Sequence, residues 1–343
     1  MALDERKSRI LNALVYRYII TGQPVGSKAL AETLNLGISP ATIRNELSAL
    51  EDMGYLYQPH ISAGRVPTYL GYRFYVDSLA GSIRLGVEEK KAILALFSSK
   101  TRELEQLLRE TTHLLSRLTR AAAMVIAPRL ERNCLKHIDL VSLREDLLLM
   151  VVITDTGRVE KMNLTLNSPV KPEDIEKVQG YLNEKLAGKK LDQLESMDTE
   201  EFLRGAQEKE LARAALEGIM EMMFREEYEK VYVGGAVNLL RGLDEEGLEK
   251  IEDLLRKFEE QYHLLHMLRE VIRSNKLVVR IGDENMASEL RSFSLIATPY
   301  NIGDEMAGTV SVLGPTRMDY ARVIPTVDFI ARSLSRALET LTG

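Results

Sequence analysis

Apolar residues recur at helical spacing near the start of the chain and predict a series of short helices. The first helix begins near Asp4 and ends before Gly22 and Pro24, because neither residue continues a helix readily. Its apolar stripe comprises Ile10, Leu11, Leu14, Val15, Tyr18 and Ile19. A second helix is expected from Ser27, which suits an N-cap, to about Leu34.

A third helix follows a turn at residues 35–37, where Asn and Gly tolerate a positive φ. Ser39 is its expected N-cap, and Pro40 suits the first helical position because the N–H that it lacks would have no partner there. At a rotation of about 100° per residue, the helix divides into two faces. The face expected to be buried holds Ile43, Leu47 and Leu50. The opposite face and its flanks hold Ala41, Thr42, Arg44, Asn45, Ser48 and Asp52.

Two short strands are expected after this helix. Gly54 ends the helix, residues 55–57 form one strand, residues 62–65 form a turn, and Val66 begins the return strand. This order of elements is typical of a winged helix-turn-helix, in which the second helix of the pair enters the major groove of DNA. DNA binding is therefore the leading prediction.

The N-terminal half of the third helix is the part expected to enter the groove, because the C-terminal half carries Glu51 and Asp52, which phosphates repel. Asn45 suits a bidentate contact to adenine, and Arg44 suits a guanine or a phosphate. Arg65, at the expected wing tip, suits a phosphate or the minor groove. The predicted DNA-contacting residues are Ser27, Lys28, Ser39, Ala41, Thr42, Arg44, Asn45, His60 and Arg65. Outside this ordered pattern, exposed residues of these types would be ordinary solvated surface.

The chain resembles the bacterial heat-inducible transcription repressor HrcA family. Over roughly residues 3–79 the resemblance lies in LDERKSRILNALVYRYIITGQPVGSKAL and SPATIRNELSALEDMGYLYQPHISAGRVPTYLGYRFYVDSL, and near the C-terminus in GTVSVLGPTRMDYARVIPTVDFIARSL. The resemblance implies a homodimer that binds double-stranded DNA at the inverted-repeat CIRCE operator and represses chaperone operons until heat stress. It also implies a chaperonin as modulator. A repressor that needs a chaperonin is expected to expose apolar surface, for which the Met-rich stretch 219–224 is the candidate.

The remainder of the chain predicts two β-rich parts around a helical block. Residues 87–122 are predicted to form a helix, with Ser98 and Ser99 as the candidate point at which it breaks. Strand-like segments are residues 135–143, 146–154, 158–166, 230–233, 276–281, 291–298 and 306–313. Residues 170–274 are otherwise helical, with apolar faces suited to a dimer, and an amphipathic helix starts at about Asp319.

We therefore predict an α+β multidomain fold. The resemblance implies a winged helix-turn-helix followed by a GAF-like α+β domain that a mostly helical dimerisation domain interrupts. The expected divisions are residues 1–78 for the DNA-binding domain, 79–125 for a linker helix, 126–168 and 275–343 for the two parts of the GAF-like domain, and 169–274 for the inserted dimerisation domain.

Composition changes this picture little. The 343 residues carry a net charge of −6, but residues 1–76 hold 8 basic and 6 acidic side chains, so a weakly basic head precedes an acidic remainder. A single cysteine, Cys134, excludes an internal disulfide and fits a reducing compartment. The charged N-terminus is no signal peptide, and no apolar run reaches the roughly 20 residues that span a bilayer. A cytoplasmic protein without membrane contact is expected.

Competing chemistry has weak support in the sequence. No phosphate-binding loop motif is present, and Gly234-Gly235 is expected to be a turn. Glu259, His263 and His266 share a helix face, so a metal-dependent enzyme is one alternative, although such trios are usually solvated surface. No catalytic residue and no cofactor are predicted. The main alternative is a regulator that senses a small molecule through the GAF-like part, for which no ligand-binding residues are identified.

Overall fold

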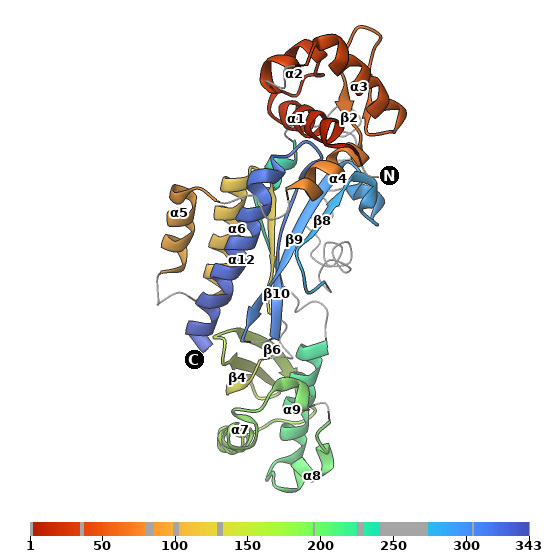
Figure 1. The fold of residues 1–343 in the computed structure, drawn as a ribbon. Coiled ribbons are helices and arrows are strands. Elements are labelled where there is room, and N and C mark those ends of the chain that lie inside the picture. Colours follow the sequence, from red (N-terminus) through yellow and green to blue (C-terminus); the bar gives the residue numbers. More distant parts are fainter. Residues whose placement is uncertain are drawn as a thin grey trace.

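The computed structural model describes residues 3–34, 38–79, 85–98, 103–128, 133–194, 196–224, 230–240, 274–303 and 305–342. Figure 1 shows an elongated molecule with three parts in a row. The head, formed by residues 3–79, occupies one end. The body, a sheet with three long helices, lies in the middle. The insertion, formed by residues 133–224, occupies the other end.

Four helices and a hairpin build the head: α1 (Glu5–Thr21), α2 (Ser27–Leu34), α3 (Pro40–Asp52), β1 (Leu56–Tyr57), β2 (Val66–Pro67) and α4 (Tyr69–Ser78). The predicted order of elements is confirmed. The predicted inner faces are also confirmed, since Ile10, Leu11, Leu14, Val15, Ile43, Leu47 and Leu50 are buried. Asp4 caps α1, and Gly22 ends it at a φ of 69°. Strands β1 and β2 pair antiparallel.

The predicted N-cap of α2 is wrong by one residue. The amide of Leu30 donates to the carbonyl of Gly26 at 3.2 Å, so Gly26 precedes the helix and Ser27 is already its first residue. Ser27 is also buried. Its hydroxyl therefore has neither the position of a cap nor the exposure that a surface contact needs.

The body is a five-stranded antiparallel sheet in the order β7-β3-β10-β9-β8. Its strands are β3 (Ala122–Ile126), β7 (Val231–Gly234), β8 (Val278–Ile281), β9 (Phe293–Ile302) and β10 (Glu305–Pro315). Helices α5 (Val87–Phe97), α6 (Leu104–Thr119) and α12 (Tyr320–Thr342) lie side by side along it (Figure 1). Alternate residues of β3 enter two different cores: Ala123 and Val125 face the helices, and Met124 packs on the opposite side with Leu239 and Phe293.

The predicted helix over residues 87–122 is two helices followed by a strand. Ser98 is the C-cap of α5, as the sequence allowed. Arg120 ends α6 in the left-handed conformation, with a φ of 54°, and the chain then pairs with β10. Because α6 packs on β3, β7 and α12, it belongs to the body, whereas the prediction made it part of a linker.

The insertion has its own sheet and its own core. Strands β4 (Leu135–Arg144), β5 (Leu147–Thr154) and β6 (Val159–Thr165) form an antiparallel meander. Helices α7 (Pro172–Leu186), α8 (Thr199–Arg204) and α9 (Lys209–Phe224) and the 3₁₀ helix η2 (Leu191–Leu194) pack with it. The predicted strands are confirmed, but their predicted grouping with residues 275–343 is not, because no strand of this meander pairs with the five-stranded sheet.

Helix α7 also covers the outer edge of β4. The side chain of Asn183 accepts from the amide of Ile138 at 2.8 Å and donates to its carbonyl at 2.7 Å, while Gln179 accepts from the amide of Leu140 at 2.8 Å. These side-chain amides satisfy backbone groups that another strand would otherwise bind, so this stretch of the edge is protected from further pairing.

Two further expectations concern apolar surface. Ile219 and Met222 are buried in the core of the insertion, so the Met-rich stretch does not expose them as expected. The apolar faces of α7 and α9 are likewise used within the chain.

The short strand predicted at residues 230–233 is confirmed as β7. The apolar series from 248 to 272, with Glu259, His263 and His266, lies outside the described residues. None of the described helices is long and apolar enough to cross a membrane.

Candidate nucleic-acid interface

Helix α3 presents the surface on which DNA binding was predicted. Ser39 caps it, with its hydroxyl oxygen accepting from the amide of Thr42 at 3.1 Å. Ala41, Arg44, Asn45 and Ser48 are exposed, and Thr42 is half-buried with its hydroxyl 3.0 Å from that of Ser39. The predicted residues of α3 therefore do share an exposed face over the N-terminal turns, where side chains have the best access to base edges.

Ion pairs fix α3 from both flanks. On one flank the carboxylate of Glu46 forms an ion pair with Lys7 of α1 at 3.0 Å, and the guanidinium of Arg6 lies 3.5 Å from the same carboxylate. On the other flank Glu51 pairs with Arg65 at 2.8 Å. Glu46 and Glu51 are thus neutralised by neighbours, whereas Asp52 at the C-terminal end of α3 is exposed. The helix is held in one orientation by the contacts to α1 and to Arg65.

The sequence predicted Arg65 at the tip of the hairpin, but it does not lie there in the structure. Its amide donates to the carbonyl of Val25, and its carbonyl accepts from the amide of Val25, each at 2.9 Å. Val25 therefore pairs with the chain just before β2. Its side chain is only 18% exposed and lies against Glu51 as an ion pair rather than as an aligned hydrogen bond. This pairing fixes Arg65 where the loop enters β2.

The tip of the hairpin is formed instead by residues 60–62. Ile61 is fully exposed, and His60 is exposed beside it. The side-chain amide of Gln58 donates to the carbonyls of Ile61 and Ala63, both at 2.9 Å, and so shapes the loop. Of the other predicted residues, Lys28 is exposed on α2 and Ser27 is buried.

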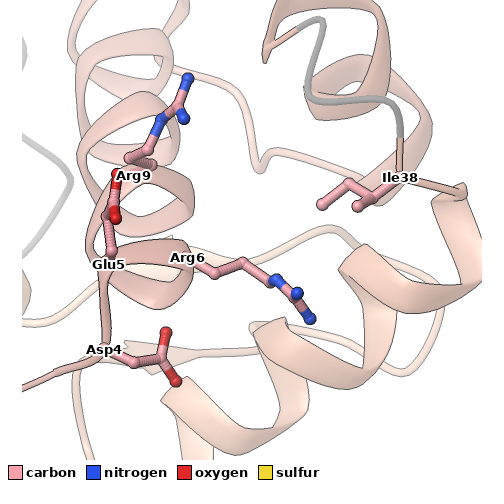
Figure 2. Close-up of a pocket in the computed structure, with 5 residues that line it drawn as sticks. All are labelled: Asp4, Glu5, Arg6, Arg9 and Ile38. Atoms are coloured by element: carbon pink, nitrogen blue, oxygen red, sulfur yellow. The ribbon is translucent and has the colours of Figure 1, made fainter.

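A hollow beside α3 holds two arginines that the sequence prediction missed. It is lined by Asp4, Glu5, Arg6 and Arg9 of α1 and its cap, and by Ile38 just before α3. Figure 2 shows Arg6 reaching from α1 toward α3, with Arg9 further along α1 at the level of Ile38. The basic run at the start of α1 was the available signal, but periodicity assigned that run only a helical role.

Asp4 is already engaged at this hollow. The Lys7 ammonium donates to its carboxylate at 2.7 Å, and this hydrogen bond lowers the pKa of Asp4 and raises the pKa of Lys7. Both groups therefore stay charged and paired near neutral pH, which leaves the two arginines as the cations that face solvent here.

The competing sites have little support. Within the described ranges no group of three or more His, Cys, Asp or Glu residues is arranged to hold a metal. Gly234 is the last residue of β7 and Gly235, with a φ of 67°, follows it; both lie against α6, where the side chain of Asn238 donates to Ser116 at 2.9 Å. Burial, and then the nearby Asp155 carboxylate, raises the pKa of the Cys134 thiol, which disfavours the reactive thiolate.

Comparison with known proteins places the whole chain in one family. The family described as HrcA protein C terminal domain matches residues 105–324. The heat-inducible transcription repressor HrcA of Desulforamulus reducens is 36% identical over 342 residues, covering 99% of each chain. The protein of the same name from Thermobifida fusca is 40% identical over 337 residues, covering 98% of this chain and 97% of that one.

A solved structure is similar as well. A crystal structure titled as that of a hypothetical protein superimposes with a TM-score of 0.67 at 27% identity, over 99% of this chain and 100% of the other. The family match covers more than half of the chain, and the relatives, which are named as transcription repressors and not as enzymes, extend along nearly all of it. The chain therefore belongs to the HrcA family of heat-inducible transcription repressors.

Proposed function

We propose that this repressor binds double-stranded DNA through its head, which we interpret as a winged helix-turn-helix. Helix α3 would enter the major groove, and the hairpin tip around His60 and Ile61 would be the wing. The observation that carries this proposal is the exposed N-terminal surface of α3, where Arg44 and Asn45 stand between two ion-paired flanks. Asn45 suits an adenine edge and Arg44 a guanine or a phosphate.

We propose a homodimer bound to an inverted repeat of the CIRCE type, because two related heads read two half-sites one DNA turn, about 34 Å, apart or a multiple of it. Bound there, the dimer would exclude RNA polymerase from promoters of chaperone operons. A chaperonin would keep the repressor active until heat diverts it to unfolded proteins. These parts of the proposal rest on family membership, and with them we propose a cytoplasmic location.

We also propose domain borders that follow the cores. The head would comprise residues 3–79, and the body, which we regard as the GAF-like domain, would comprise residues 85–128, 230–240 and 274–342. The insertion would comprise residues 133–224. Separate hydrophobic cores and separate sheets support the division between the body and the insertion.

The experiment that tests this function uses two substitutions on α3. Arg44→Ala and Asn45→Ala should each weaken operator binding by about 1–3 kcal/mol if the side chain reads a base, with a smaller loss on a scrambled duplex. Arg336→Ala is the matched control, because Arg336 is exposed near the end of α12 that lies away from the head (Figure 1). Equal losses for both DNA sequences would reduce these residues to phosphate contacts. Unchanged binding by both variants would remove α3 from the interface.

A further inference from the structure

Four of the eight basic side chains of the head are already engaged by protein groups. Lys7 is paired with Asp4 and Glu46, and Arg65 with Glu51. Arg17 donates to the carbonyl of Ala29 and the hydroxyl of Thr33, while Arg73 binds residues of the body. The small net positive charge of the head is therefore a poor guide to where an anion would bind. The place where an anion binds depends instead on which basic side chains of the head are not already engaged by protein groups.

Among the described residues of the head, Arg9, Lys28 and Arg44 make no ion pair. Arg6 is 58% exposed and makes only a long contact with Glu46, at 3.5 Å. Two of these four side chains, Arg6 and Arg9, line the same hollow. The hollow lies directly beside the start of α3, since Ile38 forms its opposite wall (Figure 2).

The acidic residues of the hollow do not cancel this charge. Asp4 is bound to Lys7, as described above. Glu5 lies one helical turn before Arg9, the spacing at which such side chains pair, but the two are not within ion-pair distance of each other. An incoming phosphate would therefore meet Arg6 and Arg9 as cations, with Glu5 in the hollow and Glu46, 3.5 Å from Arg6, as competing anions.

We propose that Arg6 and Arg9 form a phosphate-binding site that receives the DNA backbone beside the groove occupied by α3. This inference rests on the proposed function. Arginine binds a phosphodiester with paired N–H donors, and each such contact releases counterions. The site would hold the head in register on the duplex without reading its sequence, while Arg44 and Asn45 read the bases.

The test is the salt dependence of DNA binding by the full-length protein, measured by fluorescence anisotropy on an inverted-repeat duplex and on a scrambled duplex. Each lost phosphate contact lowers the slope of log K against log salt by about 0.9. Arg9→Ala should therefore lower the slope by about one on both duplexes and leave their affinity ratio unchanged. Arg9→Lys should keep the slope, because it keeps the charge.

Two further variants sharpen this test. Glu5→Gln should raise the affinity for both duplexes, since it removes the competing anion, and it leaves the cap of α1 in place. Arg6→Ala should act like Arg9→Ala, and its melting temperature will show whether loss of the Glu46 contact also loosens α3. Arg336→Ala should leave the slope unchanged.

The outcomes separate this inference from the function on which it rests. An unchanged slope for Arg6→Ala, Arg9→Ala and the double variant, in a protein that still prefers the operator, would overturn the phosphate site and leave the repressor proposal intact. Absence of any operator preference in the unsubstituted protein would overturn the repressor proposal. The scrambled duplex would then still decide whether these arginines bind phosphates.

Discussion

The two ends of the body are attached in different ways. At the head, Arg73 of α4 (Tyr69–Ser78) binds Glu284 and the carbonyl of Val279, and Tyr72 packs on Tyr320 with ring centroids 6.1 Å apart. The Arg73 and Glu284 side chains remain 26% and 32% exposed. The apolar residues of the head and of the helical side of the body form one continuous cluster.

The insertion has the opposite arrangement. Its hydrophobic core is separate from those of the body, and the junction is polar and buried. Arg158 pairs with Glu160 at 2.8 Å, with side chains 5% and 6% exposed, and donates to the carbonyl of Pro128 at 2.6 Å. Lys230, just before β7, reaches the same Glu160 at 3.2 Å.

The comparison indicates that apolar packing sets the orientation of the head, whereas charged groups set the orientation of the insertion. The head is held by shared apolar surface with a partly solvated ion pair at its rim, so its orientation should survive loss of that pair. The insertion is held where the chain leaves and re-enters the body by contacts of its buried Arg158–Glu160 pair with the carbonyl of Pro128 and with Lys230. Substitutions at the two junctions should therefore differ strongly in their effect on stability.

The largest effect is expected for Glu160→Gln. The change preserves shape but removes the Glu160 carboxylate from the buried pair with Arg158, and breaking a buried pair costs about 3–5 kcal/mol in similar cases. Urea unfolding followed by circular dichroism will measure it. The double variant Arg158→Met, Glu160→Met should recover much of the loss, because no charge then stays buried. A loss below about 1 kcal/mol for Glu160→Gln would contradict the description of this junction.

A smaller effect is expected for Gly282→Ala at the head junction. Gly282 has a φ of 55°, and a Cβ there would lie 2.3 Å from Cε1 of Tyr69. Gly303 has a φ of 60° with open space around its Cβ position, so Gly303→Ala is a control for backbone strain alone. We expect a loss of roughly 1–3 kcal/mol for Gly282→Ala, with a smaller loss for the control. Equal melting temperatures would show that the Tyr69 contact is not tight.

Loss of the head ion pair should matter less. Glu284→Gln should destabilise by about 1 kcal/mol, because solvent screens this pair. Burial raises the pKa of Glu284, but hydrogen bonds from Arg73 and from the amide of Ile281, with the charges of Arg73 and Arg280, together outweigh it, so the net pKa lies below its usual value. The contribution is therefore complete above the ordinary glutamate pKa and disappears as pH falls through the lowered value. Between pH 7 and pH 3 the unsubstituted protein should lose more stability than Glu284→Gln; parallel curves would refute this.

The smallest effect is expected for Asp77→Asn. Asp77 also pairs with Arg73, at 3.2 Å, but within one helix and with a side chain 65% exposed. Such a pair contributes about 0.3–0.5 kcal/mol. Thermal unfolding of Asp77→Asn beside Glu284→Gln will show whether the contact across the junction exceeds the one within α4. A larger effect of Asp77→Asn would reverse that ranking.

Local patterns were sufficient to predict most of the elements, although not strand β3. The inner face of α3, with Ile43, Leu47 and Leu50, follows from helical periodicity, and Ser39-Pro40 marks the helix start. The strand Leu147–Thr154 follows from a continuous and partly β-branched apolar run. These features depend on neighbours a few residues apart, which the sequence displays directly.

Long-range pairing was what the sequence did not display. Arg65 left the expected tip because it pairs with Val25, forty positions earlier in the chain, and with Glu51. Strands β4–β6 joined α7–α9 because their apolar faces fit one another, and periodicity does not choose partners. Arg6 and Arg9 were missed since their availability depends on which other cations are already paired.

The measurement that tests the account most directly is fluorescence anisotropy of the purified protein on a CIRCE-type inverted repeat and on a scrambled duplex, at one fixed salt concentration, with and without chaperonin and ATP. We predict operator-selective binding, strengthened by the chaperonin. Equal affinity for the two duplexes under both conditions would contradict the proposal that the head reads DNA sequence.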